Sequence, residues 1–154
     1  MANATASVPK KNWLVAGIIV ICFVAIVAAG LITWHDQNRC KLSLKNSCLT
    51  LEYARTPAQL AQGLGDRDSM ATNHGMLFVM GDSDAGCFWM KDMRFDLDIL
   101  WLDANQRVIK IQPNLSPSTY PQNYCPSTKP AYVLEVDGGV AAQNSIQLGQ
   151  QLRF

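Results

Sequence analysis

This chain of 154 residues contains little histidine and has almost no net basic charge. It contains two histidines, no Cys-X-X-Cys pair and no glycine-rich phosphate loop. Residues 35–154 carry 11 Lys and Arg against 12 Asp and Glu, so this part offers no basic surface to nucleic acid. The sequence therefore argues against a zinc site and against nucleic-acid binding, and it predicts no resident cofactor or metal.

Few residues could act together as a catalytic nucleophile and its general base. His74 is the only histidine after His35, and the nearest cysteine in sequence, Cys87, is expected in a disulfide. A cysteine or serine hydrolase is therefore a poor fit. The sequence leaves enzymatic activity open and favours a protein without it.

A run of 20 residues without a charge, residues 14–33, lies near the N-terminus. At about 1.5 Å of rise per residue, a helix of that length spans the roughly 30 Å hydrocarbon core of a bilayer. Two lysines precede the run, and Trp13 and Trp34 bracket it as interfacial aromatics do. The positive-inside rule then predicts a cytoplasmic tail at residues 1–13, a transmembrane signal anchor at residues 14–33 and an extracytoplasmic remainder. The expected location is the cell membrane, with the lipid bilayer as a partner.

A cleaved signal peptide is the alternative, because Val27-Ala28-Ala29 before Gly30 provides small residues at a potential cleavage site. The apolar run is longer than a typical signal-peptide core and continues past that point. An uncleaved anchor is therefore favoured. Both readings place the C-terminal part outside the cytoplasm.

Four cysteines follow the apolar run, and an even number in an oxidising compartment indicates disulfides. Cys40 and Cys48 flank a loop short enough to close as a hairpin, so we expect them to pair. The second expected disulfide then joins Cys87 to Cys125.

Residues 34–47 are interpreted as a juxtamembrane tether and residues 48–154 as a β-rich domain. Apolar or alternating segments predict strands, at residues 48–53, 75–80, 87–90, 97–102, 107–112, 131–136 and 150–154. The segment 113–130 contains five prolines and is expected to be an extended loop.

Little helix is expected in this domain. Thr56, Pro57 and Gln59 have the pattern of a capping box that begins a short helix, and a second helical turn is predicted at residues 140–144. Short strands at regular spacing with so little helix favour a compact, mainly β sandwich or barrel.

Several segments of the domain resemble the domain of unknown function 192 family. They are Gly63-Leu64, Gly75-Met76-Leu77-Phe78-Val79, Phe88-Trp89-Met90-Lys91, Leu97-Asp98-Ile99, and Tyr132-Val133-Leu134-Glu135-Val136 with Gly138. They occur in order across roughly residues 49–154. The resemblance implies a jelly-roll-like fold, often exported or membrane-anchored, and it brings no established activity.

The candidate ligand-binding residues are Trp89, Met90, Lys91, Asp98 and Glu135. Alternation along residues 97–102 places Asp98 on an apolar face, where a carboxylate needs a partner. A pocket lined by the indole and thioether, with the charged groups orienting a small ligand, is one interpretation. The favoured alternative is structural: an ion pair, with Lys91 or Arg94 as the partner of Asp98, or a loop-capping carboxylate. Glu135 raises the same question.

Five methionines crowd into 24 residues, at positions 70, 76, 80, 90 and 93. Thioethers outside the cytoplasm are ligands for Cu(I), but methionine is also a common gap-filler in cores. The second interpretation is favoured, because no Met-X-X-Met repeat or histidine pair is present.

The sequence thus predicts a membrane-anchored extracytoplasmic β-domain of unknown molecular function. We expect it to act as a non-catalytic binding or assembly module for a small ligand or a membrane-protein partner. The alternative is an extracytoplasmic enzyme or a copper-handling protein that uses the Trp89–Asp98 region.

Overall fold

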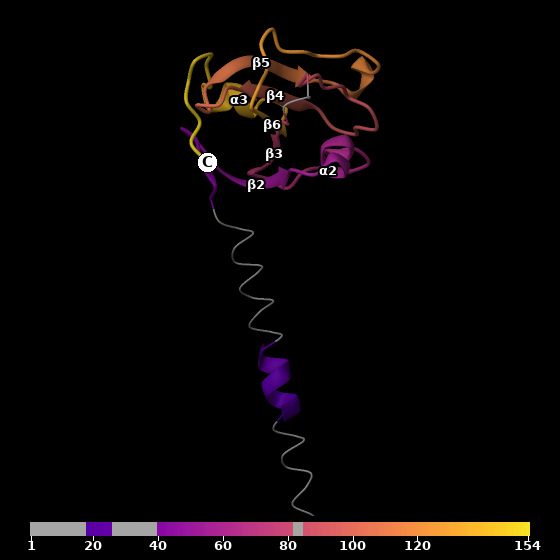
Figure 1. Cartoon of the computed structure of the whole chain (residues 1–154), viewed down its shortest axis with the longest axis vertical. Coiled ribbons are helices and arrows are strands. Elements are labelled where there is room, and N and C mark those ends of the chain that lie inside the picture. Colours follow the sequence, from indigo (N-terminus) through magenta and orange to yellow (C-terminus); the bar gives the residue numbers. More distant parts are fainter. Residues whose placement is uncertain (1–17, 26–39, 82–84) are drawn as a thin grey trace, which may run out of the picture. The chain divides into compact units, whose positions relative to one another are not determined.

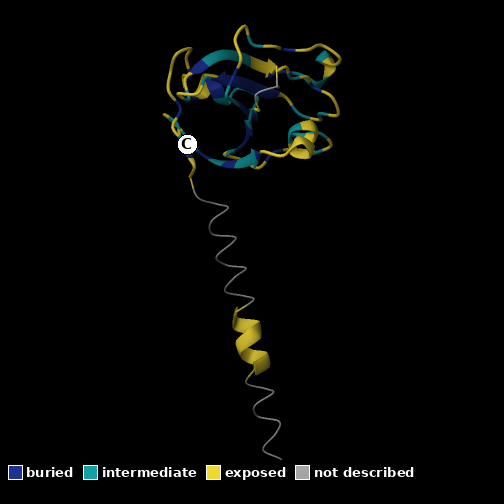
Figure 2. Ribbon diagram, in the orientation of Figure 1, coloured by how far each residue is buried: buried dark blue, intermediate teal, exposed yellow. Residues whose placement is uncertain are grey.

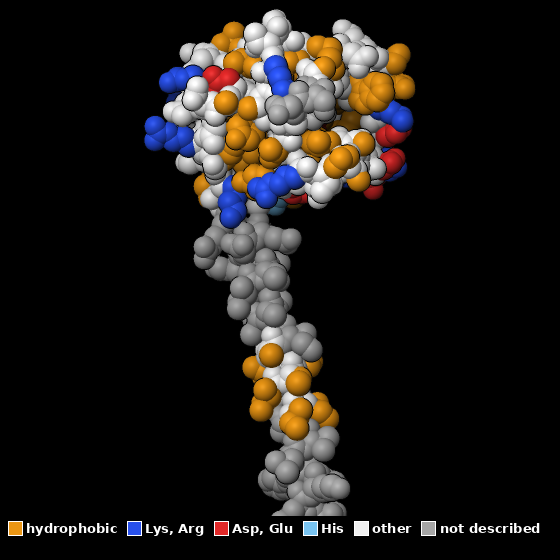
Figure 3. All heavy atoms as spheres, in the orientation of Figure 1, with side chains coloured by type: hydrophobic (Ala, Val, Ile, Leu, Met, Phe, Trp, Pro, Cys, Tyr) orange, Lys and Arg blue, Asp and Glu red, His pale blue; other side chains and the backbone are white. Residues whose placement is uncertain are grey.

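The computed structural model describes residues 18–25, 40–81 and 85–154 (Figure 1). The chain divides between Arg39 and Cys40 into two units. In the first unit, residues 18–25 form a helix with exposed side chains (Figure 2), most of them hydrophobic (Figure 3). This helix lies within the predicted anchor, and the remainder of residues 14–33 lies outside the described residues. In the described part of the chain, no helix has the length and apolar character needed to cross a membrane.

Residues 40–154 form a curled sheet of six strands that resembles half of a barrel (Figure 1). The strands are β1 (Leu42–Ser43), β2 (Cys48–Ala54), β3 (His74–Val79), β4 (Leu97–Leu102), β5 (Val108–Leu115) and β6 (Tyr132–Asp137). Their order is β1-β2-β3-β6-β4-β5, and neighbours are antiparallel except β2 and β3, which are parallel. The mainly β prediction is confirmed, while the strands form a single sheet in place of the two layers of a jelly-roll sandwich.

Apolar side chains cover both faces of this sheet. On β4, Leu97, Ile99 and Trp101 join one cluster, whereas Leu100 and Leu102 join the other, as the predicted alternation requires. Strands buried on both faces read as nearly continuous apolar runs, which is why β4 contains a single charged residue. We call the two surfaces the Trp101 face and the α3 face, after the helix α3 (Val140–Gln143) that packs on the second.

Helix α2 (Pro57–Gln62) connects the parallel strands β2 and β3. The Thr56 hydroxyl accepts a hydrogen bond from the Gln59 backbone, and the Gln59 side chain accepts one from the Thr56 backbone, which confirms the predicted capping box. Gly63 ends the helix with φ of 50°, a conformation that favours glycine. The short 3-10 helix η1 (Pro117–Thr119) lies in the predicted proline-rich loop.

Strand β5 is longer than predicted, because it continues through Pro113 to Leu115. Strand β5 lies at the edge of the sheet, where Pro113, which has no backbone N–H group, can be accommodated. The pairing with β4 shifts by one residue at this point, from Ile99 with Gln112 to Leu97 with Leu115. The extra residue on β5 interrupts the regular ladder, as a β-bulge does.

Two of the predicted strands are wrong. Residues 87–90 and 150–154 each contribute an isolated bridge, Phe88 with Tyr124 and Gln151 with Arg107. These segments are not strands of the sheet, and their apolar side chains pack over it. Phe88 lies against the Trp101 face and Leu152 is buried on the α3 face.

The four cysteines of this unit lie at disulfide distance in the predicted pairs. Cys40 and Cys48 link the chain before β1 to the first residue of β2, and Leu42 between them is fully buried. Residues 40–47 therefore belong to the same compact unit as the rest of residues 40–154. The unit contains every described strand, both apolar clusters and both disulfides, which is what an independently folding domain requires.

Candidate functional site

A pocket of about 700 Å³ lies where the parallel strands β2 and β3 reach their carboxyl ends. Arg55 and Pro57 follow β2, and Val79 and Met80 come from the end of β3 and the residue after it. Helix α2 and the segment 85–89 complete the described walls. The carboxyl ends of parallel strands are a common ligand position in α/β proteins, and the volume falls in the range of small-molecule sites.

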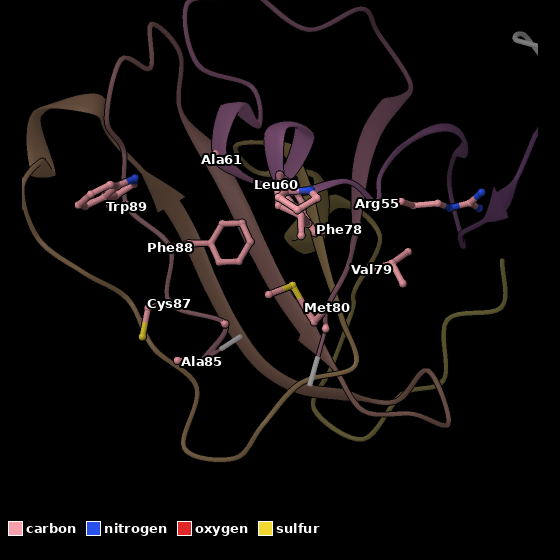
Figure 4. Close-up of a pocket in the computed structure, with 13 residues that line it drawn as sticks. Arg55, Leu60, Ala61, Phe78, Val79, Met80, Ala85, Cys87, Phe88 and Trp89 are labelled. Carbon is pink, nitrogen blue, oxygen red and sulfur yellow. The ribbon is translucent and has the colours of Figure 1, made fainter. Parts of the chain in front are cut away.

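The side chains of the described lining are almost entirely apolar, and backbone groups add polar surface to it. It consists of Arg55, Pro57, Leu60, Ala61, Phe78, Val79, Met80, Gly81, Ala85, Gly86, Cys87, Phe88 and Trp89. Figure 4 shows Phe88 and Met80 directed toward the middle of the pocket, with Trp89 at one end and Arg55 at the other. The guanidinium of Arg55 is directed away from that middle and lies 4.4 Å from the centre of the Tyr53 ring.

The segment 85–89 is held on the sheet by aromatic and polar contacts. The Phe88 ring packs edge-on between Phe78 and Trp101, at centroid distances of 4.9 and 6.3 Å. The Trp101 indole N–H donates a 2.6 Å hydrogen bond to the Gly86 carbonyl, and this is a buried contact. The disulfide of Cys87 also joins the segment to the loop after η1. Phe88 is therefore fixed as a wall of the pocket.

Trp89 forms an exposed rim at its end of the pocket. Its side chain is half exposed, at 49%, and so is that of Tyr120, at 46%. The two rings meet edge to face with centroids 5.9 Å apart. Large aromatic side chains that remain this exposed are typical of ligand or partner contacts.

The structure places the consecutive candidates Trp89, Met90 and Lys91 in three different environments. Trp89 lines the pocket, whereas Met90 is buried in the cluster on the Trp101 face. The Lys91 ammonium is exposed and lies 3.9 Å from the Asp92 carboxylate. Only the first of the three contributes to the pocket as described.

Asp98 is fully buried on the α3 face. Its Oδ1 accepts hydrogen bonds from the backbone N–H groups of Asn114 at 2.8 Å and Gly139 at 3.0 Å, and its Oδ2 accepts one from Ala141 at 2.7 Å. The carboxylate thus connects the bulge of β5 to the first turn of α3, in the manner of the loop-capping alternative. The suggested partner Arg94 pairs with Asp68 instead.

Glu135 is 5% exposed and lies on the Trp101 face, between Met76 of β3 and Ile99 of β4. Loss of hydration raises the pKa of Glu135 to about 8, against an opposing attraction from Arg67. Arg67 itself makes a bidentate pair with Glu52, at 2.8 and 2.9 Å, and these hydrogen bonds lower the pKa of Glu52 despite partial burial. Glu135 is therefore a buried acid that carries its proton at neutral pH, and it is not among the pocket residues.

The methionines lie together in the apolar cluster of the Trp101 face. Met70, Met76 and Met90 are buried there, and Met80 and Met93 pack against it. This is the environment in which methionine fills gaps of a core. In the described ranges, no three histidine, cysteine or acidic side chains are grouped so that they could hold a metal ion.

Sequence reasoning missed most of the pocket. Leu60, Ala61, Phe78, Met80 and Phe88 were expected to be helix, strand or core residues and carry no polar signature. Trp89 is the pocket residue that the sequence does identify, as a wall of a pocket shared with Met90. The proximity of α2 to segment 85–89 depends on the parallel pairing of β2 and β3, which hydrophobic periodicity does not reveal.

Comparisons with known proteins agree with this fold. A crystal structure of a protein of unknown function from Novosphingobium aromaticivorans DSM 12444 is similar over 70% of this chain and 76% of that chain, with a TM-score of 0.65 and 30% identity. A crystal structure from Sinorhizobium meliloti 1021, of a protein described as a proposed transcription regulator, covers 68% of this chain and 81% of its own, with a TM-score of 0.62 and 35% identity. No match is found among curated proteins.

A family match accounts for the whole compact unit. Residues 40–154 match DUF192, which is described as an uncharacterised ACR. The match extends the resemblance seen in the sequence to Cys40, Cys48 and β1, which were expected to lie outside the family pattern. The chain therefore belongs to the DUF192 family.

Proposed function

We propose that this protein is a non-catalytic binding module, held at the outer face of a membrane by residues 14–33, and that the pocket between α2 and segment 85–89 receives a small ligand. The observation that carries the proposal is the pocket itself. It has the volume of a small-molecule site, it lies at the carboxyl ends of two parallel strands, and its rim carries the half-exposed Trp89.

The chemistry of the described walls favours binding over catalysis. Apart from Arg55, the described lining offers no side chain that could act as a general acid or base. The acids predicted as candidates lie elsewhere: Asp98 is engaged by three backbone amides on the α3 face, and Glu135 is buried between Met76 and Ile99. An enzyme or copper site built on the Trp89–Asp98 region is less favoured, because these residues belong to opposite faces of the sheet.

The extracytoplasmic location is supported by two features. Disulfides persist in oxidising compartments, and the unit carries two pairs of cysteines at disulfide distance. The uncharged run of residues 14–33 is long enough to span a bilayer, and the lysines that precede it favour a cytoplasmic N-terminus.

A ligand screen on residues 40–154 tests the binding function. A compound that binds the folded state raises the melting temperature, because it adds stability that grows with the logarithm of its concentration over Kd and reaches about 2.7 kcal/mol at a hundredfold excess. We expect at least one compound in a panel of metabolites, glycans, alcohols and carboxylic acids to do so.

Two substitutions on one helix separate pocket binding from binding elsewhere. Ala61 and Ala58 are both exposed on α2, but only Ala61 lines the pocket. Ala61→Phe should fill the pocket and abolish the shift, whereas Ala58→Phe should preserve it. A panel without any binder, or a binder that responds equally to both variants, would refute the proposed site.

A further inference from the structure

The described lining lacks the groups that polar ligands need. Apart from Arg55, it contains no charged, hydroxyl, carboxamide or imidazole side chain, and the indole N–H of Trp89 is its remaining side-chain donor. Sugars, nucleotides and amino acids each carry several hydrogen-bonding groups, and each group left unpaired in an apolar site costs free energy. The described side chains therefore favour an apolar group of the ligand in this pocket.

Among the described lining residues, no charged group is aimed at the interior of the pocket. The Arg55 guanidinium stacks 4.4 Å from the centre of the Tyr53 ring and is directed away from the lining side chains (Figure 4). A carboxylate or phosphate inside the pocket would gain no ion pair from the lining side chains that the structure describes. A charged head group is better accommodated outside it, in solvent.

The arrangement of the walls suits an extended chain more than a compact group. Trp89 and Arg55 stand at opposite ends of the row of lining side chains, with Leu60, Met80 and Phe88 between them (Figure 4). A volume of about 700 Å³ exceeds what a single apolar side chain requires. Met80 is unbranched and adaptable, so it can follow a flexible chain.

The exposed rim is suited to the junction between an apolar chain and a polar head. Trp89 and Tyr120 are each about half exposed and contact one another. Both side chains combine an apolar ring with a polar atom, and such residues are enriched where hydrocarbon meets water or head groups.

We infer that the pocket holds a linear alkyl chain, with the polar head of the ligand at the rim formed by Trp89 and Tyr120. This inference rests on the proposed binding function. A free fatty acid and a membrane lipid both supply such a chain, and the experiment below distinguishes the two sources.

Chain length is the decisive variable. Hexanol, octanol and decanol are titrated into residues 40–154 by calorimetry below their solubility limits, in parallel with hexanoate, octanoate and decanoate. Each buried methylene should increase the affinity about fourfold, so each step of two methylenes should increase it about 15-fold. Alcohol and carboxylate of equal length should bind similarly, because no charged side chain of the described lining is aimed at the interior.

The Ala61→Phe and Ala58→Phe pair serves as the internal control, since only the first should remove the dependence on chain length. Residues 40–154 are also tested for co-sedimentation with phosphatidylcholine vesicles. If Ala61→Phe abolishes this co-sedimentation and Ala58→Phe does not, the alkyl chain belongs to a membrane lipid. Binding of monomeric carboxylates without such co-sedimentation assigns it to a free acid.

Three results overturn the inference, and they show whether the binding function falls with it. If a polar compound of the screen binds in a manner that Ala61→Phe abolishes, while the alcohols and carboxylates do not bind, the binding function stands and the alkyl assignment falls. If the affinity does not change with chain length, the assignment also falls. If no compound binds in the pocket at all, both proposals fall together.

Discussion

Asp98 accepts backbone hydrogen bonds from two separate segments, and its replacement by Asn measures what that connection contributes to stability. Oδ1 accepts from Asn114 and Gly139, and Oδ2 accepts from Ala141. An Asn side chain keeps one acceptor oxygen and turns an NH₂ group toward at least one of the three amides. That amide is then buried without a partner.

The magnitude follows from these three contacts. Leaving one buried donor unpaired costs about 1–3 kcal/mol. Hydrogen bonds to a charged acceptor are stronger than those to a neutral one, so the two contacts that remain are each weakened. We therefore expect Asp98→Asn to lower the free energy of unfolding by about 2–4 kcal/mol.

Urea unfolding of residues 40–154 is the appropriate assay. With a slope of about 2 kcal/mol per molar urea, the expected loss lowers the midpoint by roughly 1–2 M. Asp103→Asn is a matched control, because Asp103 also accepts two backbone hydrogen bonds, from Asn105 and Arg107, but in an exposed turn. If Asp98→Asn costs no more than this control, or raises the stability, the structural role is refuted and a ligand role for Asp98 becomes the better interpretation.

Three further predictions concern groups elsewhere in the chain. The pKa of Glu135 rises from 4.5 to about 8 on folding. Between these pH values the folded state holds a proton that the unfolded state has lost. The free energy of unfolding should therefore fall as pH rises from about 4.5 through 8, by at most about 1.4 kcal/mol per pH unit. Glu135→Gln should flatten that dependence in urea titrations between pH 5 and 9, and an unchanged slope would contradict the assignment. Replacing both Cys87 and Cys125 by Ser opens a link between positions 38 residues apart, which should cost about 4 kcal/mol by chain entropy, as measured by the urea midpoint; mass mapping that finds four free thiols in the oxidised unit would remove the basis of this estimate. Protease added to intact cells should degrade the domain and spare an N-terminal tag, and a mature N-terminus at Gly30 would exclude the uncleaved anchor.

Local patterns predicted the elements that depend on neighbouring residues. The capping box of α2 involves Thr56, Pro57 and Gln59, and the alternation along β4 depends only on residues two apart. The pairing of Cys40 with Cys48 follows from a short loop. Each of these features is determined within a few residues of sequence, so the sequence alone was sufficient.

Features that depend on strand pairing were not accessible in this way. The apolar segment 87–90 reads as a strand, yet it contributes one bridge and covers the Trp101 face. Asp98 was correctly identified as a carboxylate that needs a partner, but the partners are backbone amides of a bulge and a helix start. Backbone amides are present at every non-proline residue, so no residue type marks them in a sequence.

The two faces of the sheet differ in what a substitution would change. On the α3 face, Asp98 joins β4, β5 and α3 through buried contacts, so a change there acts first on stability. On the Trp101 face, the pocket wall made by α2 contains no buried residue, and its helix is stabilised by the capping box at one end and Gly63 at the other. A substitution at an exposed position of α2 therefore removes little packing. The pocket can accordingly be altered without unfolding the domain, which is why substitutions on α2 report on binding while those at Asp98 report on the fold.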